Sequence, residues 1–360
     1  MNAASDALWA RLREAGLVEG DVPPDAVHMP WYVRVMMGFA GWIGALFLMG
    51  FVGAAFAVVY KVPASGLVIG ALMCGGATAL FRAKPDSDFF EQFGLAVSLA
   101  GQGLMGYGLG SLFAFDVGTT ALLFALVEVA LFLLIPSFLH RVISAAAAGA
   151  SLVVAATDWG FYHFTGAVVF AAFAWAWLNE FRLIRRGVEV RSFAYGMTLL
   201  VIGQLVMLAG ARAINDAVLG HGRHAIGGAA APWIGPIVVG IVFVVVVWRL
   251  LARQRVAPGS GPGLAALAGA LVVAVVSLKA PGFGVCVAIV LLGHAHGNHV
   301  LSGLGIAALV AYWSWYYYSL EITLLEKSAV LAGAGVVLVL ARLAMNARWP
   351  RAGAKGAGDA

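Results

Sequence analysis

Long apolar runs recur along the whole chain, and they constrain its fold more than any other feature of the sequence. A run of about 17 to 25 residues is long enough to cross the hydrocarbon core of a bilayer as a helix. About twelve such runs, some of them shorter, lie at 32–60, 65–81, 90–113, 119–135, 142–156, 165–183, 192–211, 233–251, 263–278, 282–292, 300–318 and 328–345. The predicted fold class is therefore all-α: a polytopic transmembrane helix bundle with about 12 (10–12) spans. The runs at 65–81, 142–156 and 282–292 can also be re-entrant or paired into one bent span.

Composition agrees with a lipid environment. Of the 360 residues, 62% are hydrophobic and 11% are charged, a balance that a single soluble core cannot bury. The net charge of +5 does not indicate a nucleic-acid partner, because the arginines cluster beside the apolar runs as orientation in a membrane requires. Cys74 and Cys286 lie inside apolar runs, so no disulfide framework is implied.

The chain divides into three parts by composition. Residues 1–30 are predicted to form a cytoplasmic amphipathic helix, from Ser5 to about Gly16, and a linker that Pro23 and Pro24 keep out of the helix. Residues 31–346 form the transmembrane helical bundle, and residues 347–360 form a cytoplasmic disordered tail. The amphipathic helix can lie on the bilayer surface or dock against the bundle or a partner.

The distribution of lysine and arginine predicts the orientation. With the N-terminus inside and twelve spans, seventeen of the 22 cations fall in cytoplasmic segments, and the outer segments keep Lys61, Arg212, Arg223, Lys279 and Lys327. Cytoplasmic loops carry such an excess of positive charge. Both termini are therefore expected in the cytoplasm, and the protein is expected to be a multi-pass protein of the bacterial cytoplasmic (inner) membrane.

Three polar side chains are predicted near the middle of the bilayer. Glu128 lies near the centre of TTALLFALVEVALFLLIPS, and Gln102 and Gln204 lie at comparable depth in their own runs. Ionisable side chains at this depth are costly and usually functional. Glu128 is interpreted either as a protonated carboxyl that links helices through a hydrogen bond or as part of a proton or substrate relay. The third alternative is that the predicted helix boundary is misplaced and Glu128 does not lie at this depth.

A second group of polar side chains is predicted on the outer face. A candidate vestibule there contains Tyr316, Tyr317, Glu321, Lys327, Asp158, Asp216, His221 and His224. Because Tyr317 and Glu321 are four residues apart, they can share a helix face and line a cavity that opens outward. The alternative is a belt of aromatic side chains at the membrane interface.

No motif identifies an enzyme or a cofactor. The segment GHAHGNHV contains His294, His296 and His299, but their spacing does not bring three imidazoles to one face, and a turn is predicted instead of a metal site. Neither a nucleophile elbow nor a zinc-protease motif nor a phosphate-binding loop is present. No catalytic residues, metal or cofactor are predicted, and enzymatic activity is uncertain, leaning to none.

Two segments carry a resemblance to a known family. The chain resembles the bacterial family of uncharacterised polytopic membrane proteins called domain of unknown function 4401. The resemblance lies in the segments WYYYSLEITLLEKSAVLAGAGVVLVLARL near the C-terminus and PWYVRVMMGFAGWIGALFLMGFVGAAFA near the start. The resemblance implies an integral inner-membrane protein with no assigned activity. It also implies a candidate partner, a small membrane protein that bears a Gly-Asp-Tyr and Leu-x-Tyr motif.

Two functional hypotheses follow. The first is a non-enzymatic membrane component, a scaffold or sensor that works with a membrane partner. The alternative is a small-solute or ion/proton transporter with an outward-facing polar vestibule, which accounts for the many spans and for Glu128. Both hypotheses have the lipid bilayer as the surrounding medium and exclude nucleic acid as a partner.

Overall fold

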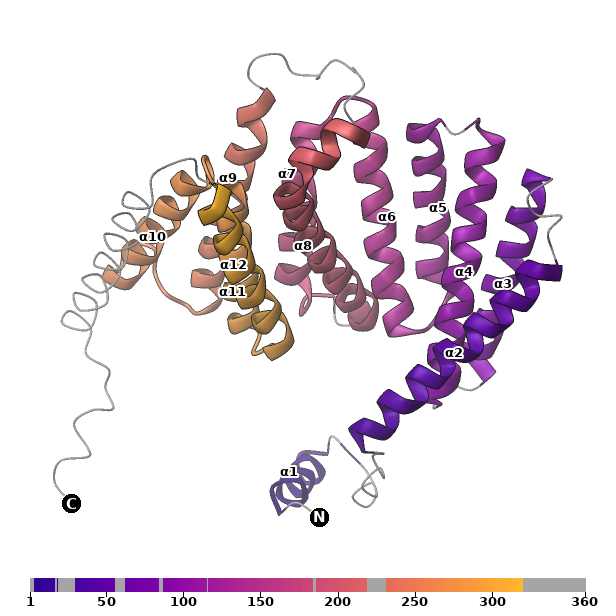
Figure 1. Ribbon diagram of the computed structural model, residues 1–360. Helices are drawn as coiled ribbons and strands as arrows, with labels where there is room; N and C mark the ends of the chain where they lie inside the picture. The colour runs from indigo at the N-terminus through magenta and orange to yellow at the C-terminus, as the bar shows by residue number, and fades with distance from the viewer. Residues whose placement is uncertain are drawn as a thin grey trace. The chain divides into compact units, whose positions relative to one another are not determined.

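The computed structural model describes residues 3–16, 18, 30–55, 62–83, 87–114, 116–183, 186–218 and 231–319. These residues form twelve α-helices, and no strand occurs among them (Figure 1). The helices are α1 Ala3–Glu14, α2 Trp31–Ala55, α3 Pro63–Ala83, α4 Asp88–Leu112, α5 Val117–Leu134, α6 Phe138–Asp158, α7 Tyr162–Asn179, α8 Gly187–Val218, α9 Ala231–Arg253, α10 Gly261–Ser277, α11 Pro281–Ala295 and α12 His299–Ser319.

The helices follow the apolar runs of the sequence. Each of the helices from α2 to α12 coincides with one predicted run, and α1 matches the predicted N-terminal amphipathic helix. The last predicted run, 328–345, and the tail at 347–360 lie outside the described residues. The all-helical fold class is thus confirmed, whereas the number of spans and the side on which the termini lie remain predictions.

Six of the described helices are long and apolar enough to cross a membrane. They include the segments Ala64–Ala83, Val117–Leu134, Phe138–Asp158, Gly187–Met207, Pro232–Arg253 and His299–Ser319. Shorter apolar segments occur at Met36–Phe47, Gly261–Ser277 and Gly282–Ala295. Large apolar side chains on these helices are widely exposed, as lipid-facing surfaces are. The helices therefore indicate a membrane-embedded protein.

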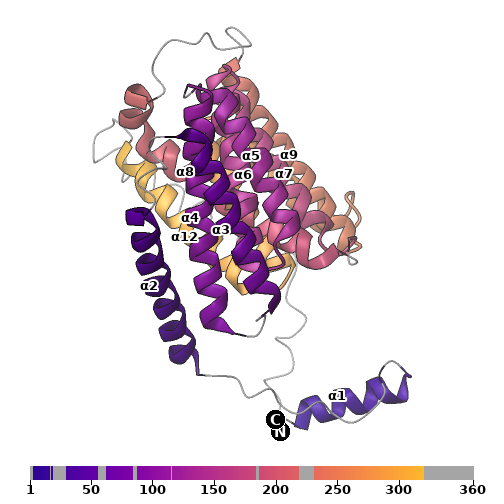
Figure 2. The same cartoon turned by 90° about the vertical axis from the view of Figure 1, so that its right-hand side faces the viewer.

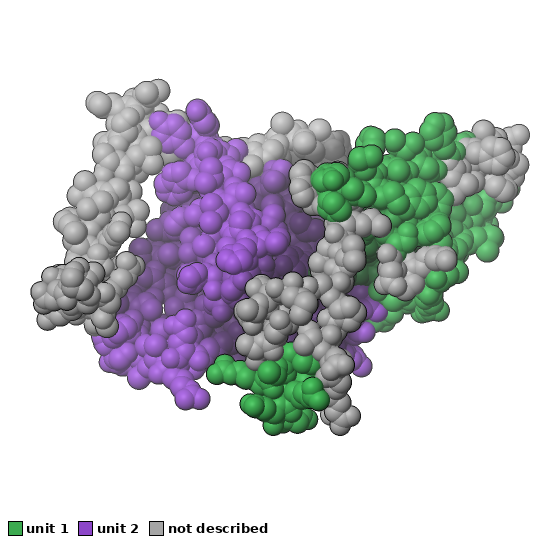
Figure 3. All heavy atoms as spheres, turned by 90° about the horizontal axis from the view of Figure 1, so that it is seen from below, with its two compact units in different colours: residues 1–115, 133–140 green, residues 116–132, 141–360 purple. Residues whose placement is uncertain are grey.

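The chain divides into two compact units, which Figure 3 colours separately. Unit 1 comprises residues 1–115 and 133–140, and unit 2 comprises residues 116–132 and 141–360. The end of α5 and the first turn of α6 therefore belong to unit 1, although most of both helices belongs to unit 2.

Unit 1 is organised by close packing of α3 against α4, which lie side by side in Figures 1 and 2. A Cβ atom on Gly101 would lie 2.7 Å from the carbonyl oxygen of Gly70, and one on Gly66 would lie 3.1 Å from that of Leu104. Glycine lets helix backbones approach this closely in lipid, where van der Waals contact drives association. Helix α2 packs on α4 in the same way at Gly41, so α4 is the central helix of this unit.

Unit 2 is built around α7, which packs against α8, α9 and α11. The side chains of Phe170, Phe173 and Trp177 on α7 are at most 1% exposed and belong to the largest apolar core. Helix α11 also packs against α12, and α10 packs against α9.

Candidate functional site

Glu128 occupies the buried stripe of α5. The buried positions of this helix are Gly118, Ala125, Glu128 and Leu131, whose spacing places them along one helical face. Leu126 and Val129, on either side of Glu128 in the helix, are 58% and 45% exposed. The stripe is narrow, and its single ionisable group is directed into the protein and away from the exposed apolar surface.

The Glu128 carboxyl is buried without a hydrogen-bond partner among the described residues. Its side chain is 0% exposed, and neither carboxylate oxygen has a hydrogen-bond partner among the described residues. The hydroxyl of Ser144 on α6 lies near the carboxyl and interacts with it, but the contact falls short of hydrogen-bond geometry. A carboxylate without partners is costly in a low-dielectric interior, so the carboxyl holds its proton in this state.

A network of buried polar side chains occupies unit 1. His140, in the first turn of α6, places Nε2 2.8 Å from Oγ of Ser98 and 3.0 Å from Nε2 of Gln102, both on α4. The Ser98 hydroxyl also lies 3.7 Å from Sγ of Cys74 on α3, and Phe81 packs its ring edge-on against the imidazole. All four polar residues, Cys74, Ser98, Gln102 and His140, are at most 5% exposed.

This unit 1 network differs chemically from the Glu128 position. Oγ of Ser98 and Nε2 of Gln102 both approach Nε2 of His140, and none of these three side chains has a buried polar atom without a hydrogen-bond partner. The Cys74 thiol donates to the Ser98 carbonyl oxygen at 3.5 Å. Satisfied buried networks fix helices relative to one another, whereas an unsatisfied buried group points to a functional role. Ser98 is 0% exposed, so its hydroxyl is closed off from solvent in this structure.

Comparison with models of known protein families assigns the chain to a family. The model described as Domain of unknown function (DUF4401) matches residues 30–348, which is most of the chain. The chain belongs to this family. The match confirms the resemblance indicated by the two terminal motifs, and it covers every helix from α2 to α12. No curated protein and no solved structure matches the chain.

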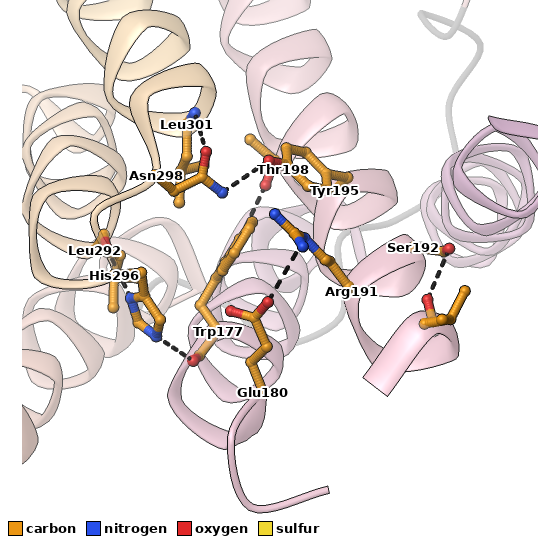
Figure 4. Close-up of polar contacts among 11 residues, drawn as sticks. Trp177, Glu180, Arg191, Ser192, Tyr195, Thr198, Leu292, His296, Asn298 and Leu301 are labelled. Atoms are coloured by element: carbon orange, nitrogen blue, oxygen red, sulfur yellow. Dashed lines mark hydrogen bonds and ion pairs between the residues drawn. The ribbon is translucent and has the colours of Figure 1, made fainter. Parts of the chain in front are cut away.

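A second polar network in the DUF4401 domain joins α7, α8 and the turn between α11 and α12 (Figure 4). Nε1 of Trp177 donates to Oγ1 of Thr198 at 3.1 Å, and both side chains are fully buried. Nδ2 of Asn298 donates to Oη of Tyr195 at 2.7 Å, while Oδ1 of Asn298 accepts from the backbone N–H of Leu301 at 3.1 Å. Asn298 thus caps α12 and ties it to α8.

The histidine-rich segment of the domain forms the predicted turn. His296 and Gly297 follow α11, and Gly297 has a φ of +61°, which suits glycine. Nδ1 of His296 lies 2.7 Å from the carbonyl oxygen of Leu292, and Nε2 lies 3.0 Å from that of Trp177 (Figure 4). These carbonyls are in the last turns of α11 and α7, so the ring lies between the ends of two helices, where a ring N–H can donate to a terminal carbonyl oxygen. Within the described residues, no cluster of metal-binding side chains occurs.

The remaining sequence-predicted residues are only partly described. Gln204 is half-buried on α8 and has no hydrogen bond to Glu128 among the described contacts, whereas Gln102 joins the network around His140. Tyr316 and Tyr317 are half-buried near the end of α12, where Tyr316 stacks on Tyr312 at a centroid distance of 6.1 Å.

Asp158 is half-buried at the end of α6, and its Oδ2 lies 2.7 Å from the position that a Cβ on Gly118 would occupy. Asp216 lies on α8, but its side chain is outside the described set. His221, His224, Glu321 and Lys327 are also outside the described residues, so the vestibule remains a prediction.

Three buried polar residues of the DUF4401 domain are not predicted from the sequence: His140, Ser98 and Ser144. His140 was hidden because it follows Pro136 and Ser137 in a segment that resembles a loop between two spans. A signal was nevertheless present: Ser98 and Gln102 are four residues apart in one apolar run, which gives α4 a polar face that requires partners. Only the folded chain shows that a histidine supplies them.

Proposed function

We propose that this DUF4401 protein is an integral protein of the bacterial inner membrane that carries protons, alone or together with a small solute, across the bilayer. The observation that supports this function is the Glu128 carboxyl, which is fully buried and lacks a hydrogen-bond partner among the described residues. Ionisable groups in such positions mark proton relays and substrate pathways in membrane proteins.

The chemistry requires only the carboxyl and water. In the buried state Glu128 is neutral, because no cation lies beside the carboxyl among the described residues and burial disfavours a negative charge. When a conformational change hydrates the α5 stripe from one side of the membrane, water stabilises the carboxylate and the proton leaves. Ser144 is close enough to stabilise the ionised form, and reprotonation from the other side completes a transfer.

Both termini lie in the cytoplasm, and about twelve spans place the proposed vestibule on the outer face. Tyr316 and Tyr317 contribute hydroxyl groups to its lining from α12, and Asp158 contributes a carboxylate from the end of α6. Glu321, Lys327, Asp216, His221 and His224 complete the proposed lining.

Proton flux in proteoliposomes tests the proposal. Purified protein is reconstituted with a pH-sensitive dye inside, and a membrane potential is applied across otherwise proton-tight vesicles. We expect acidification above that of protein-free vesicles, and at least a tenfold loss for Glu128→Gln, which preserves the volume of the side chain but cannot ionise. Glu14→Gln, at the exposed end of α1, is the matched control and should retain the flux. Equal flux in Glu128→Gln and wild type would remove the proposal.

A scaffold or sensor that works with a membrane partner is the second candidate function. The networks around His140 and Asn298 support it, because satisfied polar networks hold helices in fixed positions, as a docking platform requires. The proposed partner is a small membrane protein with a Gly-Asp-Tyr and Leu-x-Tyr motif. Copurification of such a protein after crosslinking, together with flux no greater than that of protein-free vesicles, would favour this function over transport.

A further inference from the structure

The C-terminal ends of α7 and α9 meet at the side chain of Arg253, the last residue of α9. Nη2 of Arg253 donates to the carbonyl oxygen of Leu178 in the last turn of α7, and Nη1 lies 3.3 Å from Nε2 of His296. A cation at helix C-termini is favourable because the unpaired carbonyls carry partial negative charge. The guanidinium group is thereby held in place across the ends of two helices.

Other arginines surround this point with little negative charge to balance them. Arg182, just after α7, and Arg249, one turn before Arg253 on α9, lie close enough to repel the charge of Arg253. Glu180 is the one carboxylate that acts on Arg253 among the described residues, and it also pairs with Arg191 at 3.7 Å. The carboxylate that acts on Arg253 is therefore shared with Arg191.

The helix surfaces that lead to these arginines are apolar and exposed. On α7, Trp175 is 54% exposed and precedes the exposed Arg182 by seven residues. On α9, Ile241 and Val245 are 57% and 47% exposed and precede the exposed Arg249 by eight and four residues, which places all three on one helical face. Helix α9 thus presents an apolar face that ends in an arginine, and on α7 an exposed tryptophan precedes the turn that carries Arg182.

We propose that the cluster of Arg182, Arg249 and Arg253 binds the phosphate headgroup of an anionic phospholipid whose acyl chains lie along the exposed faces of α7 and α9. The excess positive charge matches a phosphodiester, and arginine binds phosphate oxygens with two parallel hydrogen bonds. The apolar faces match acyl chains, which a free anion lacks. The site is independent of Glu128 and goes beyond proton transport.

Native mass spectrometry of the detergent-solubilised full-length protein tests the site. The probes are phosphatidylglycerol, phosphatidylcholine and inorganic phosphate, each titrated separately. The test variant is Arg182→Gln/Arg249→Gln, which leaves the anchored Arg253 intact. Arg11→Gln/Arg13→Gln removes the same charge from exposed positions of α1 and is the matched control. Arg249→Gln alone is the milder variant if the double substitution fails to fold.

We expect wild type and control to retain phosphatidylglycerol in preference to phosphatidylcholine. The apparent Kd for phosphatidylglycerol should rise by about fivefold for each arginine removed from the cluster. Equal retention of both lipids by wild type would overturn the proposal, as would unchanged phosphatidylglycerol binding in a folded cluster variant. Inorganic phosphate could instead saturate the site and displace phosphatidylglycerol in a manner that depends on Arg249. That result would assign the site to a free anion and overturn the proposal that a phospholipid binds there.

Discussion

Oγ of Ser98 lies 2.8 Å from Nε2 of His140, and both side chains are 0% exposed. This contact joins the middle of α4 to the first turn of α6, and the amide of Gln102 reaches the same imidazole nitrogen at 3.0 Å. Two polar side chains of α4 therefore meet one imidazole nitrogen of α6 within apolar surroundings, which makes the contact a determinant of unit 1 stability.

Substitutions in the network around His140 should lower the free energy of unfolding by different amounts. Ser98→Ala leaves the Gln102 bond intact and should lower the free energy of unfolding by about 1 kcal/mol. His140→Phe leaves both Ser98 and Gln102 without this partner and should cost roughly 2 to 5 kcal/mol. Denaturant titration in mild detergent measures both. A His140→Phe protein as stable as wild type would show that the network contributes nothing.

Replacing Glu128, unlike replacing His140, should not lower the stability of the protein. Because its carboxyl has no hydrogen-bond partner among the described residues, Glu128→Leu removes a buried polar group without breaking a bond. Its stability should be unchanged or raised by about 1 kcal/mol, while proton flux is lost. A loss of stability in the same titration would indicate a structural carboxyl that bonds across helices.

The α3–α4 contact predicts a contrast between two glycines of α4. In Gly101→Ala the new Cβ would lie 2.7 Å from the Gly70 carbonyl oxygen and 2.9 Å from Sγ of Cys74, so the helices must separate, at a cost of about 1 to 3 kcal/mol. Gly103→Ala meets no atom within 4 Å and should be neutral or stabilising by about 0.5 to 1 kcal/mol. Thermal unfolding of the two variants tests the contrast, and similar midpoints would contradict it.

Asn298 should stabilise unit 2 through two separable bonds. Asn298→Ala loses both the α12 cap and the bond to Tyr195, and should cost about 1 to 3 kcal/mol. Tyr195→Phe removes only the second bond and should cost about 1 kcal/mol. Equal losses in chemical unfolding of the two variants would mean that the cap contributes little.

The proposed orientation can be tested with single cysteines in described turns. Phe161→Cys, between α6 and α7, should react with an impermeant thiol reagent from outside intact cells, and Ala257→Cys, between α9 and α10, only after the cells are opened. Cys74 and Cys286 are buried and should give little background. Labelling of both positions from the same side would contradict the arrangement.

The sequence alone determined the helices and their approximate bounds. Runs such as 142–156 and 300–318 coincide with α6 and α12, because hydropathy and the need for internal backbone hydrogen bonds act within each segment. The same local chemistry singled out Glu128, since a carboxyl in an apolar run is visible without any knowledge of its neighbours.

Only the tertiary structure decided which polar groups meet. Gln102 bonds to His140, a residue 38 positions later in a segment that resembles a loop, and Arg253 reaches the end of α7 from the end of α9. Such pairings depend on how helices pack, and helix packing depends on close contacts between distant glycines and small side chains that hydropathy does not encode. The same packing decides that the His140 network is satisfied while the Glu128 carboxyl lacks a hydrogen bond among the described residues.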